Sequence, residues 1–564
     1  IAPENEDAKG ISILCSLCQQ TIYPYHLFYH KKTHKALTLL GYDSSQAKMD
    51  NETLLAQRHK LISKLTRFPK YSERHRQKID YSFEFLMDDH TPTPYCDLDN
   101  TNSPSTPTKV KNSSIKALSV CQDKNSIWQG DMEDRFFVVD NYGNRPDTCF
   151  LGLVDGYRGV TAAETVVAEF PLLFLDQLAQ IDSSYKKTEE EQQILNSFTT
   201  VIEADYRKNE KMFSDKQEND ETNKTKNYEW IHKAYAKSFW RMDRLLQLGR
   251  NEVSKVRWSG CSAVTCLIER LPSKNTDGTE EGKHFENSTH SPLTRTAEDV
   301  AGLLHIANIG NVHAVLCKNG KSYCLSKEHS TSNVSERKRI LQNGGNISTN
   351  EPDGLVEGHL RTTRGLGHHG DPVLKRSVIP VPHSISVPID DSCQFLVIAS
   401  NGLWEVLDYN QVCALTLTTF THYLRMYECD QQNEASLYKC QYLMPLSEGD
   451  LNDSKATNDG IEILYSNKDI FLTDSKGNLT QSYTGQQLLK TTLPVDCKPP
   501  TDFEEDTKIY LSDCESQTAG RGRVTSGTLY DNAASYISEQ LVKTALAAGS
   551  RDNITIMIVL LNGC

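Results

Sequence analysis

The spacing of apolar residues constrains the fold of this chain more than any other feature. From Ser119 onward, short apolar runs rich in Val, Ile and Phe stand between turn-forming residues, which is typical of buried strands. The runs are Phe136–Val139, Cys149–Val154, Ala263–Ile268, Leu303–Ala307, Val312–Leu316, Phe395–Ala399 and Ile554–Leu561. They predict a sheet-rich core.

Segments with helical periodicity separate these runs. Gly344 and Gly549 stand just past two of them, where a left-handed residue commonly ends a helix. Because strands and helices do not alternate strictly, the pattern favours sheets packed face to face with helices outside over a doubly wound parallel sheet. We therefore expect an α+β fold. The helical segments are Thr161–Gln180, Trp230–Leu248, Ser335–Asn343 and Asp531–Ala548.

Polar segments divide the chain into three predicted parts. Residues 91–114 are rich in Pro, Ser, Thr and Asn and are expected to form a linker. Three further polar segments contain too few apolar residues to offset the entropy of ordering, so we expect mostly disordered surface insertions at 205–228, 272–298 and 428–527. The parts are a Cys/His-containing segment at 8–45, a partly helical and Pro/Ser/Thr-rich linker region at 46–118, and a folded domain at 119–564.

Charge and length exclude several classes of protein. The 564 residues include 61 Lys and Arg and 74 Asp and Glu, and the formal net charge of −13 disfavours binding to nucleic acid or to an anionic membrane. No apolar run approaches the ~18–20 residues of a membrane-spanning helix. The 16 Cys residues are too dilute for a disulfide scaffold and indicate a reducing compartment. We expect a monomeric intracellular protein, cytoplasmic or nuclear, with other proteins or phosphoproteins as partners.

The N-terminal segment has two Cys and two His residues with the spacing of a metal site. Cys15 and Cys18 are separated by two residues, and His30 and His34 lie one helical turn apart. Two thiolates and two imidazoles are suitable ligands for a tetrahedral Zn²⁺ ion. The segment resembles the two-Cys, two-His zinc finger, with one residue fewer between the Cys and His pairs.

Two alternatives to this zinc site stay open. His26 lies four residues before His30 and is a second candidate ligand, and a Cys pair beside a His-rich amphipathic stretch can also bind no metal. Leu27, together with Ile22 or Tyr23, stands where a small finger needs its apolar core. Because one finger reads only about 3 bp of DNA, protein docking is the expected use of this segment.

Acidic residues stand at the ends of three predicted strands. Glu133 and Asp134 precede the first strand, Asp155 and Gly156 follow the second, and Asp552 precedes the last. Carboxylates gathered from strand ends supply hard oxygen ligands for Mg²⁺ or Mn²⁺, and two such ions can activate water and hold a phosphate. Taken singly, each has a simpler explanation as a turn, a solvated pair or a cap. Their order along the chain decides between these explanations.

Seven ordered segments resemble motifs of the metal-dependent (type 2C) protein serine/threonine phosphatases. They are Met132–Asp134, Val154–Gly159, Ser259–Ala263, Ala307–Val315, Arg364–Gly367, Ile398–Val406 and Gly549–Ile554, and Glu336 with Arg339 and Ile340 also fits. The resemblance implies a four-layer sandwich of two antiparallel β-sheets flanked by helices. It also implies a metal site built from Glu133, Asp134, Asp155, the Gly156 carbonyl, Asp552 and the residue at position 401.

The chain departs from the family pattern at its metal positions. Asn401 replaces the second core metal aspartate, and Asn311 replaces the aspartate linked to a third metal. Glu405 is a longer version of an outer acidic ligand. Because each Asp-to-Asn change removes one negative charge, the affinity for a divalent cation should fall. We expect a partial site in which Mg²⁺ or Mn²⁺ binds weakly or not at all.

The groups that would act on a phosphate ester are also replaced. Gln129 stands in place of the arginine that cradles the substrate phosphate. Tyr157 stands in place of the histidine proposed as general acid, and a tyrosine pKa of ~10 suits proton transfer at neutral pH poorly. Arg158 replaces a glycine beside the site, and His368 replaces an aspartate. We expect the two catalytic positions, 129 and 157, to be non-functional.

These departures predict a type 2C phosphatase-like protein that is a weak or inactive pseudophosphatase and serves in signal transduction as a binding or regulatory module. The rival hypothesis is an active metal-dependent protein serine/threonine phosphatase that hydrolyses phosphoserine and phosphothreonine. A third hypothesis, an adaptor that binds nucleic acid through the finger, is disfavoured by the net charge of −13.

Overall fold

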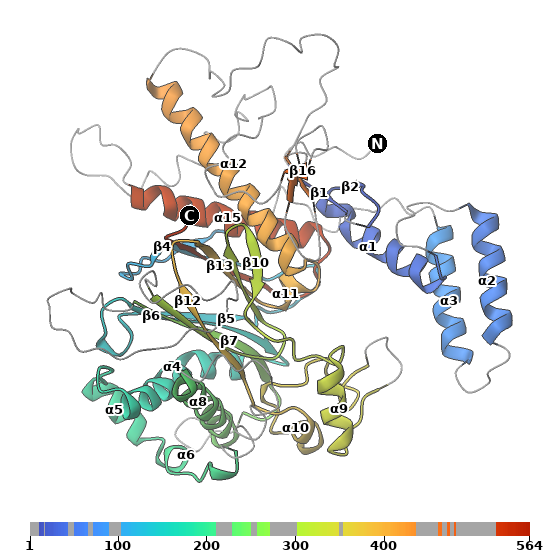
Figure 1. Cartoon of the computed structure of the whole chain (residues 1–564). Coiled ribbons are helices and arrows are strands. Elements are labelled where there is room, and N and C mark those ends of the chain that lie inside the picture. The colour runs from blue at the N-terminus through green and yellow to red at the C-terminus, as the bar shows by residue number, and fades with distance from the viewer. Residues whose placement is uncertain are drawn as a thin grey trace, which may run out of the picture. The chain divides into compact units, whose positions relative to one another are not determined.

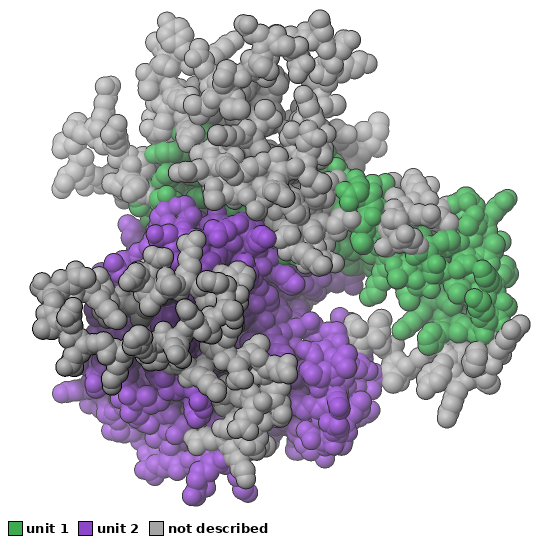
Figure 2. Space-filling view, viewed as in Figure 1, with its two compact units in different colours: residues 1–100, 410–533, 547–549 green, residues 101–409, 534–546, 550–564 purple. Residues whose placement is uncertain are grey.

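The computed structural model of the chain (Figure 1) contains two compact units. Figure 2 shows unit 1, which comprises residues 1–100, 410–533 and 547–549, and unit 2, which comprises residues 101–409, 534–546 and 550–564. Among the described helices, none is both long and apolar enough to cross a membrane. The structure describes residues 11–15, 17–42, 50–65, 72–88, 103–209, 228–249, 256–270, 302–348, 354–435, 461–464, 471–473, 479–480 and 526–564.

Unit 2 is built around two β-sheets in which all strand pairs are antiparallel. The first sheet has the order β10-β9-β13-β17-β4-β3, and the second has the order β12-β8-β7-β6-β5, with β11 paired to β7. The strands of the first sheet are β3 (Thr106–Pro107), β4 (Ile115–Asp123), β9 (His313–Lys318), β10 (Lys321–Cys324), β13 (Cys393–Ala399) and β17 (Ile554–Leu561). Those of the second are β5 (Arg135–Asp140), β6 (Thr148–Tyr157), β7 (Gly260–Arg270), β8 (Gly302–Ile309), β11 (Leu366–Gly367) and β12 (His383–Ile389).

The central strand β6 explains why its sequence is a continuous apolar run. Cys149, Leu151 and Leu153 are fully buried in an apolar cluster that also contains side chains of β4, β9, β13 and β17 from the first sheet. Phe150 and Val154, which alternate with them, belong to a second cluster that includes side chains of helices. Both faces of the strand are therefore buried, one between the sheets and one beneath helices.

Helices flank both sheets. Figure 1 shows α4 (Thr161–Ile181) and α8 (Glu229–Leu248) beside the second sheet, where the rings of Phe174 and Tyr235 stack with centroids 4.1 Å apart. On the first sheet, Ser119 Oγ of β4 lies 3.3 Å from the hydroxyl of Ser538 in α15. The predicted fold of two antiparallel sheets flanked by helices is confirmed.

The four helices predicted from periodicity are all present. The last of them is α15 (Ser526–Ala547), and Gly344 and Gly549 end two of the helices with left-handed φ angles of +76° and +88°. Further helices of unit 2 are the 3₁₀ turn η3 (Tyr142–Asn144), α5 (Glu189–Asn196), α6 (Thr199–Ile202), α9 (Val334–Gln342), α10 (Pro372–Ser377) and α11 (Asn401–Trp404).

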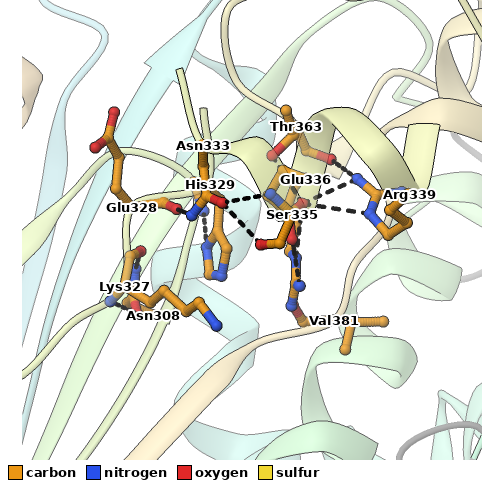
Figure 3. A network of polar contacts seen from close by, with 12 residues as sticks. Asn308, Lys327, Glu328, His329, Asn333, Ser335, Glu336, Arg339, Thr363 and Val381 are labelled. Atoms are coloured by element: carbon orange, nitrogen blue, oxygen red, sulfur yellow. Dashed lines mark hydrogen bonds and ion pairs between the residues drawn. The ribbon is translucent and has the colours of Figure 1, made fainter. Parts of the chain in front are cut away.

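A small lobe that contains α9 and α10 is held together by a buried carboxylate. Arg364 Nη2 lies 2.6 Å from Glu336 Oε1, and Figure 3 shows that Thr363 and Arg339 also bond to this carboxylate. Burial would raise the pKa of Glu336, but hydrogen bonding to Arg364 and its charge hold the pKa well below the usual range. Glu336 and Arg364, which belong to two of the matched segments, thus have a structural role.

A second buried carboxylate, Glu269 of β7, joins three further residues. His305 Nε2 lies 3.0 Å from Glu269 Oε1, and Arg145 Nη1 and the Tyr185 hydroxyl lie 2.6 Å and 2.9 Å from Oε2. Burial raises the pKa of Glu269, but its hydrogen bond to His305 and the charges of His305 and Arg145 outweigh this and lower the pKa from 4.5 to about 2. The ionised carboxylate therefore stabilises the fold.

We expect Glu269→Gln to destabilise unit 2 by up to about 3 kcal/mol at neutral pH. Because the folded pKa is depressed, this stabilisation is present above pH 4.5 and is lost as the pH falls towards 2. Urea unfolding of wild type and variant should therefore differ at neutral pH and converge in acid. The exposed Glu203→Gln is the control, and a difference that stays constant down to low pH would contradict this account.

Unit 1 combines a small sheet with helices. Its sheet has the order β16-β15-β14-β1-β2, in which β14 pairs with β1 in parallel. Helices α1, α2 and α3 share an apolar cluster centred on Leu37, Leu40, Leu54 and Ile79. The elements are β1 (Ile11–Leu14), β2 (Thr21–Ile22), α1 (Pro24–Leu39), α2 (Asn51–Leu65), α3 (Ser72–Met87), α12 (Tyr409–Ala435), β14 (Ile461–Leu464), β15 (Phe471–Thr473) and β16 (Leu479–Thr480).

Two features differ from the sequence-based expectations. The strands of unit 2 begin at Thr106, before the expected start of the domain at 119, because β3 pairs with Val120 and Ser119 of β4. Three short strands, β14 to β16, form within the segment 428–527, whose polar composition gave no sign of them. The segment 272–298, residues 210–227 and the rest of 428–527 between α12 and α15 lie outside the described residues.

Candidate functional site

Asn401 connects two of the acidic residues predicted from strand ends. Its main-chain N–H donates to Asp155 Oδ2 at 2.9 Å, and its Nδ2 donates to Asp552 Oδ2 at 3.0 Å. Asp155 comes from the end of β6, Asp552 precedes β17, and Asn401 opens α11. Asp134, which precedes β5 and is 1% exposed, accepts a hydrogen bond from Thr555 Oγ1 at 2.8 Å. The structure thus brings residues from four segments to one centre.

This centre crowds carboxyl groups in a poorly solvated place. Burial raises the pKa of Asp134 to about 7. Burial, followed by the charges of Asp134 and Asp552, raises the pKa of Asp155 well above its usual range. Burial also raises the pKa of Glu405. Neighbours that supply positive charge or hydrogen-bond donors stabilise the ionised form of such carboxyl groups.

Glu133 and Gly156 connect the ends of neighbouring strands. The Glu133 carboxylate accepts a hydrogen bond from the Gly159 N–H at 2.8 Å, and its own N–H donates to Asn553 Oδ1 at 2.8 Å. A Cβ at position 156 would lie 2.6 Å from the Glu133 carbonyl oxygen, so only glycine allows this close approach. Glu133 therefore holds the loop that follows Asp155.

Glu405 binds the loop before β17. Its Oε1 accepts hydrogen bonds from Ser550 Oγ at 2.9 Å, from the Arg551 N–H at 2.6 Å and from the Asp552 N–H at 3.2 Å. These donors occupy one carboxylate oxygen of the residue that the sequence suggested as an outer ligand. Glu405 thus fixes the backbone that carries Asp552.

The two asparagines that replace family aspartates contact one another. Asn311 Nδ2 donates to Asn401 Oδ1 at 2.6 Å. The Asn311 Oδ1 is 3.0 Å from His313 Nε2, and His313 Nδ1 is 2.8 Å from Ser326 Oγ. His313 was not predicted as a site residue, although it lies two residues after Asn311 within a matched segment. A continuous polar chain therefore runs from Ser326 to Asp552.

The donor set in this arrangement does not fit the pair of divalent cations that the family resemblance implies. Mg²⁺ and Mn²⁺ require oxygen ligands. Asn401 instead directs an amide N–H at Asp552, and its side-chain oxygen is already bonded to Asn311. The position that should complete the oxygen shell thus supplies a hydrogen-bond donor.

Two further departures from the family pattern, Tyr157 and His368, also contact one another. Their rings stack with centroids 4.9 Å apart and planes inclined by 19°. A Cβ at position 260 would lie 2.1 Å from His368 Nε2, so Gly260 makes room for this ring. Burial raises the pKa of Tyr157 well above 10 and lowers the pKa of His368 to about 4. Neither ring can therefore exchange a proton readily at neutral pH.

The residues at positions 129 and 158 do not form a phosphate clamp. Gln129 Nε2 donates to the Arg551 carbonyl at 2.9 Å, so its amide binds the neighbouring loop. The Arg551 guanidinium lies over the Trp128 ring, 4.6 Å from its centroid. Arg158 is exposed and has a left-handed φ of +61° at the position where the family has glycine.

The four predicted zinc ligands of unit 1 come together. Cys15 Sγ lies 3.4 Å from His34 Nε2, Cys18 Sγ lies 3.4 Å from His30 Nε2, and the two Nε2 atoms are 2.9 Å apart. All four ligand atoms lie within 4.8 Å of one another. A tetrahedral zinc ion with ordinary bond lengths separates its ligands by about 3.3–3.8 Å, so the two Cys–His distances fit Zn²⁺, whereas the two His nitrogens lie closer together than in such a site.

Local structure explains how this cluster forms. Cys15 follows β1, and its N–H and carbonyl bond to Gln20 O and Gln19 N at 2.8 Å, which closes the turn before β2. His30 and His34 lie one turn apart on α1. Burial and then the proximity of His34 lower the pKa of His30 to about 4, so its imidazole is in the neutral, ligating form at pH 7.

The structure distinguishes between the candidate zinc ligands and between the candidate core residues of the finger. His26, the second candidate ligand, is not a member of the group of four. Ile22 and Leu27 are buried, as expected for the apolar core of a small finger, whereas Tyr23 is only half-buried.

Comparison with known proteins agrees with the motif assignment. A family model described as Protein phosphatase 2C matches residues 206–427. The chain is 43% identical to Protein phosphatase 2C-like domain-containing protein 1 of Homo sapiens, over 98% of this chain and 90% of that protein. It is 39% identical to the protein of the same name in Mus musculus, over 98% and 88% of the two chains. Protein phosphatase 2C homolog 1 of Saccharomyces cerevisiae is 25% identical over 53% of this chain and 81% of that protein.

Proposed function

The chain belongs to the protein phosphatase 2C family, and we propose that unit 2 is a pseudophosphatase domain, weak or inactive as a catalyst, that serves as a binding or regulatory module. The family acts on phosphoproteins and depends on Mg²⁺ or Mn²⁺. The proposed partners of this chain are therefore proteins or phosphoproteins that it binds without efficient hydrolysis.

The amide of Asn401 is the observation that carries this proposal. Catalysis in the family needs cations at this centre to activate water and to hold the phosphate. Here the amide nitrogen of Asn401 donates to Asp552, and Asn311 occupies its oxygen. The remaining oxygens of Glu133, Asp134, Asp155, Gly156 and Asp552 form a partial shell, for which we propose weak binding of Mg²⁺ or Mn²⁺ at most.

The replaced catalytic positions support the same proposal. The leaving oxygen of a phosphoserine or phosphothreonine needs a proton, and a positioned acid contributes roughly 10²–10⁴-fold to the rate. The half-buried Tyr157 ring stacks on His368, and its raised pKa makes it a poor acid. Gln129 supplies a neutral amide that is already bonded to the Arg551 carbonyl, where a charged guanidinium fork would bind phosphate.

The test is the Mn²⁺-dependent turnover of a phosphothreonine peptide by the purified full-length chain. We expect the wild-type rate to equal that of Asp155→Ala. If the site does not catalyse hydrolysis, removal of its Asp155 carboxylate cannot lower the rate. The exposed Asn141→Asp serves as a control for handling and stability. Turnover that is clearly above background and is lost in Asp155→Ala would instead establish the rival function, an active serine/threonine phosphatase.

For unit 1, we propose a structural Zn²⁺ held by Cys15, Cys18, His30 and His34. The mutual distances of the four ligand atoms support this site, which would use all four ligands and leave no position for a substrate. A closed site of this kind stabilises a fold and does no chemistry, so we propose that the segment 8–45 docks proteins. Among the cysteines whose side chains the structure describes, none forms a disulfide, and we propose an intracellular location.

A further inference from the structure

We infer that Asn311 and Asn401 together replace, by hydrogen bonds, the divalent cation that would otherwise hold the carboxylates of this centre, so that unit 2 keeps its fold without metal. The inference rests on the proposed function, since it explains how the domain tolerates the loss of its metal site. It concerns stability, which can be measured separately from catalysis.

Asn401 bonds to two of the carboxylates that the family resemblance assigns to the metal site. Its main-chain N–H bonds to Asp155 at 2.9 Å, and its side-chain N–H bonds to Asp552 at 3.0 Å. These carboxylates come from β6 of one sheet and from the loop before β17 of the other. One residue thus joins the ends of both sheets.

An aspartate at position 401 would keep the main-chain bond to Asp155 but could not donate to Asp552. Its carboxylate would face Asp552 Oδ2 at the distance of the present hydrogen bond, 3.0 Å, in a centre where Asp134 and Asp155 are buried. Two like charges so close repel strongly when they are poorly solvated. The amide supplies a donor and no charge, so it removes the repulsion that the cation would have to balance.

Asn311 and His313 fix the orientation of the Asn401 amide. The His313 ring carries one N–H in its neutral form. If His313 Nδ1 accepts from Ser326 Oγ at 2.8 Å, then Nε2 carries the hydrogen and donates to Asn311 Oδ1 at 3.0 Å. Asn311 must then direct its Nδ2 at Asn401, whose Oδ1 accepts this bond. The Nδ2 of Asn401 is thereby left to face Asp552.

The experiment compares thermal unfolding of the full chain with and without millimolar Mg²⁺. Mg²⁺ is the probe because it does not compete for the thiolate and imidazole ligands of unit 1. Hydrogen–deuterium exchange of peptides from β6 and β17 reports on unit 2 alone. We expect the Tm and the exchange of wild type to be unchanged by Mg²⁺.

Three variants test the role of the amides. Asn401→Asp should lower the Tm by roughly 5 °C without metal and regain it with Mg²⁺. Asn311→Ala, which adds no charge, should lower the Tm by a smaller amount that Mg²⁺ does not restore. Asn141→Asp, the matched control, makes the same change of charge at an exposed residue and should leave the Tm unchanged.

A wild-type Tm that rises by several degrees with Mg²⁺ would overturn the inference, as would an Asn401→Asp variant as stable as wild type without metal. If Asn401→Asp does not fold, the wild-type response and Asn311→Ala still decide the question. Phosphatase activity of the same wild-type sample is a separate readout. Turnover would overturn the proposed function, whereas a Mg²⁺-dependent Tm without turnover would overturn this inference alone.

Discussion

A triple variant carrying Gln129→Arg, Tyr157→His and Asn401→Asp is expected to hydrolyse a phosphothreonine peptide with Mn²⁺ at least ~10²-fold faster than wild type. The arginine would restore a bidentate phosphate clamp, and the histidine would restore an acid with a pKa near neutrality. The aspartate would restore an oxygen ligand where Asn401 now directs an N–H at Asp552. Steady-state rates of wild type, the single variants and the triple variant provide the measurement.

The single variants should gain far less than the triple variant. Asn401→Asp alone should tighten Mn²⁺ binding but leave the phosphate without a clamp and the leaving oxygen without an acid. Since groups that act as a unit are non-additive, the gain of the triple should exceed the product of the singles. Arg158→Gly is a further change to combine, because this exposed arginine stands beside the site.

The control for this series is Asp155→Ala in the triple background, which should abolish the restored rate. A folded triple variant that binds Mn²⁺ but does not turn over would show that the backbone geometry of the site has also departed from the family. The first region to compare is the contact between residues 157 and 368, because the histidine introduced by Tyr157→His would lie against the His368 ring.

The second large effect concerns zinc. We expect the full chain to bind one Zn²⁺ and Cys15→Ser to weaken this binding at least ~10²-fold, because the thiolate supplies one of four bonds whose formation drives local folding. Zinc competition with a chromogenic chelator measures the affinity. Hydrogen exchange of α1 should rise in the same variant, because His30 and His34 on this helix lose their anchor.

His26→Ala is the matched control for the zinc prediction. His26 lies on the same helix as His30, yet it does not belong to the group of four ligands. This variant should therefore keep full zinc affinity. Loss of zinc in His26→Ala together with retention in His34→Ala would assign the site to the other histidine pair, and retention in Cys15→Ser would remove the finger.

The sequence predicted the buried strands well because both faces of strands such as β6 are covered, which leaves a plain apolar run. The edge strand β12 (His383–Ile389) was not predicted. Its residues alternate between polar and apolar and include Pro388, so they form no continuous apolar run. The strand β14 was not predicted, because only its pairing with β1 identifies it as a strand. A short strand such as β14 forms only with its distant partner, so its own residues do not identify it.

The candidate site was predictable in its members but not in its connections. Single positions such as Asn311, Asn401, Tyr157 and His368 could be recognised as departures from motifs. Their contacts in pairs, Asn311 with Asn401 and Tyr157 with His368, could not, because the members of each pair are separated by many residues and no local periodicity joins them. His313 was missed because its role depends on hydrogen bonds to Asn311 and Ser326 that no motif indicates.

The position of β17 has a consequence for synthesis on the ribosome. This last strand stands between β13 and β4 in the middle of its sheet, although it is made from residues 554–561. Until residues 554–561 have been synthesised, β4 and β13 each have an open edge, and such edges invite pairing with other nascent chains. A chain that lacked β17 would have its first sheet in two separate pieces, β10-β9-β13 and β4-β3.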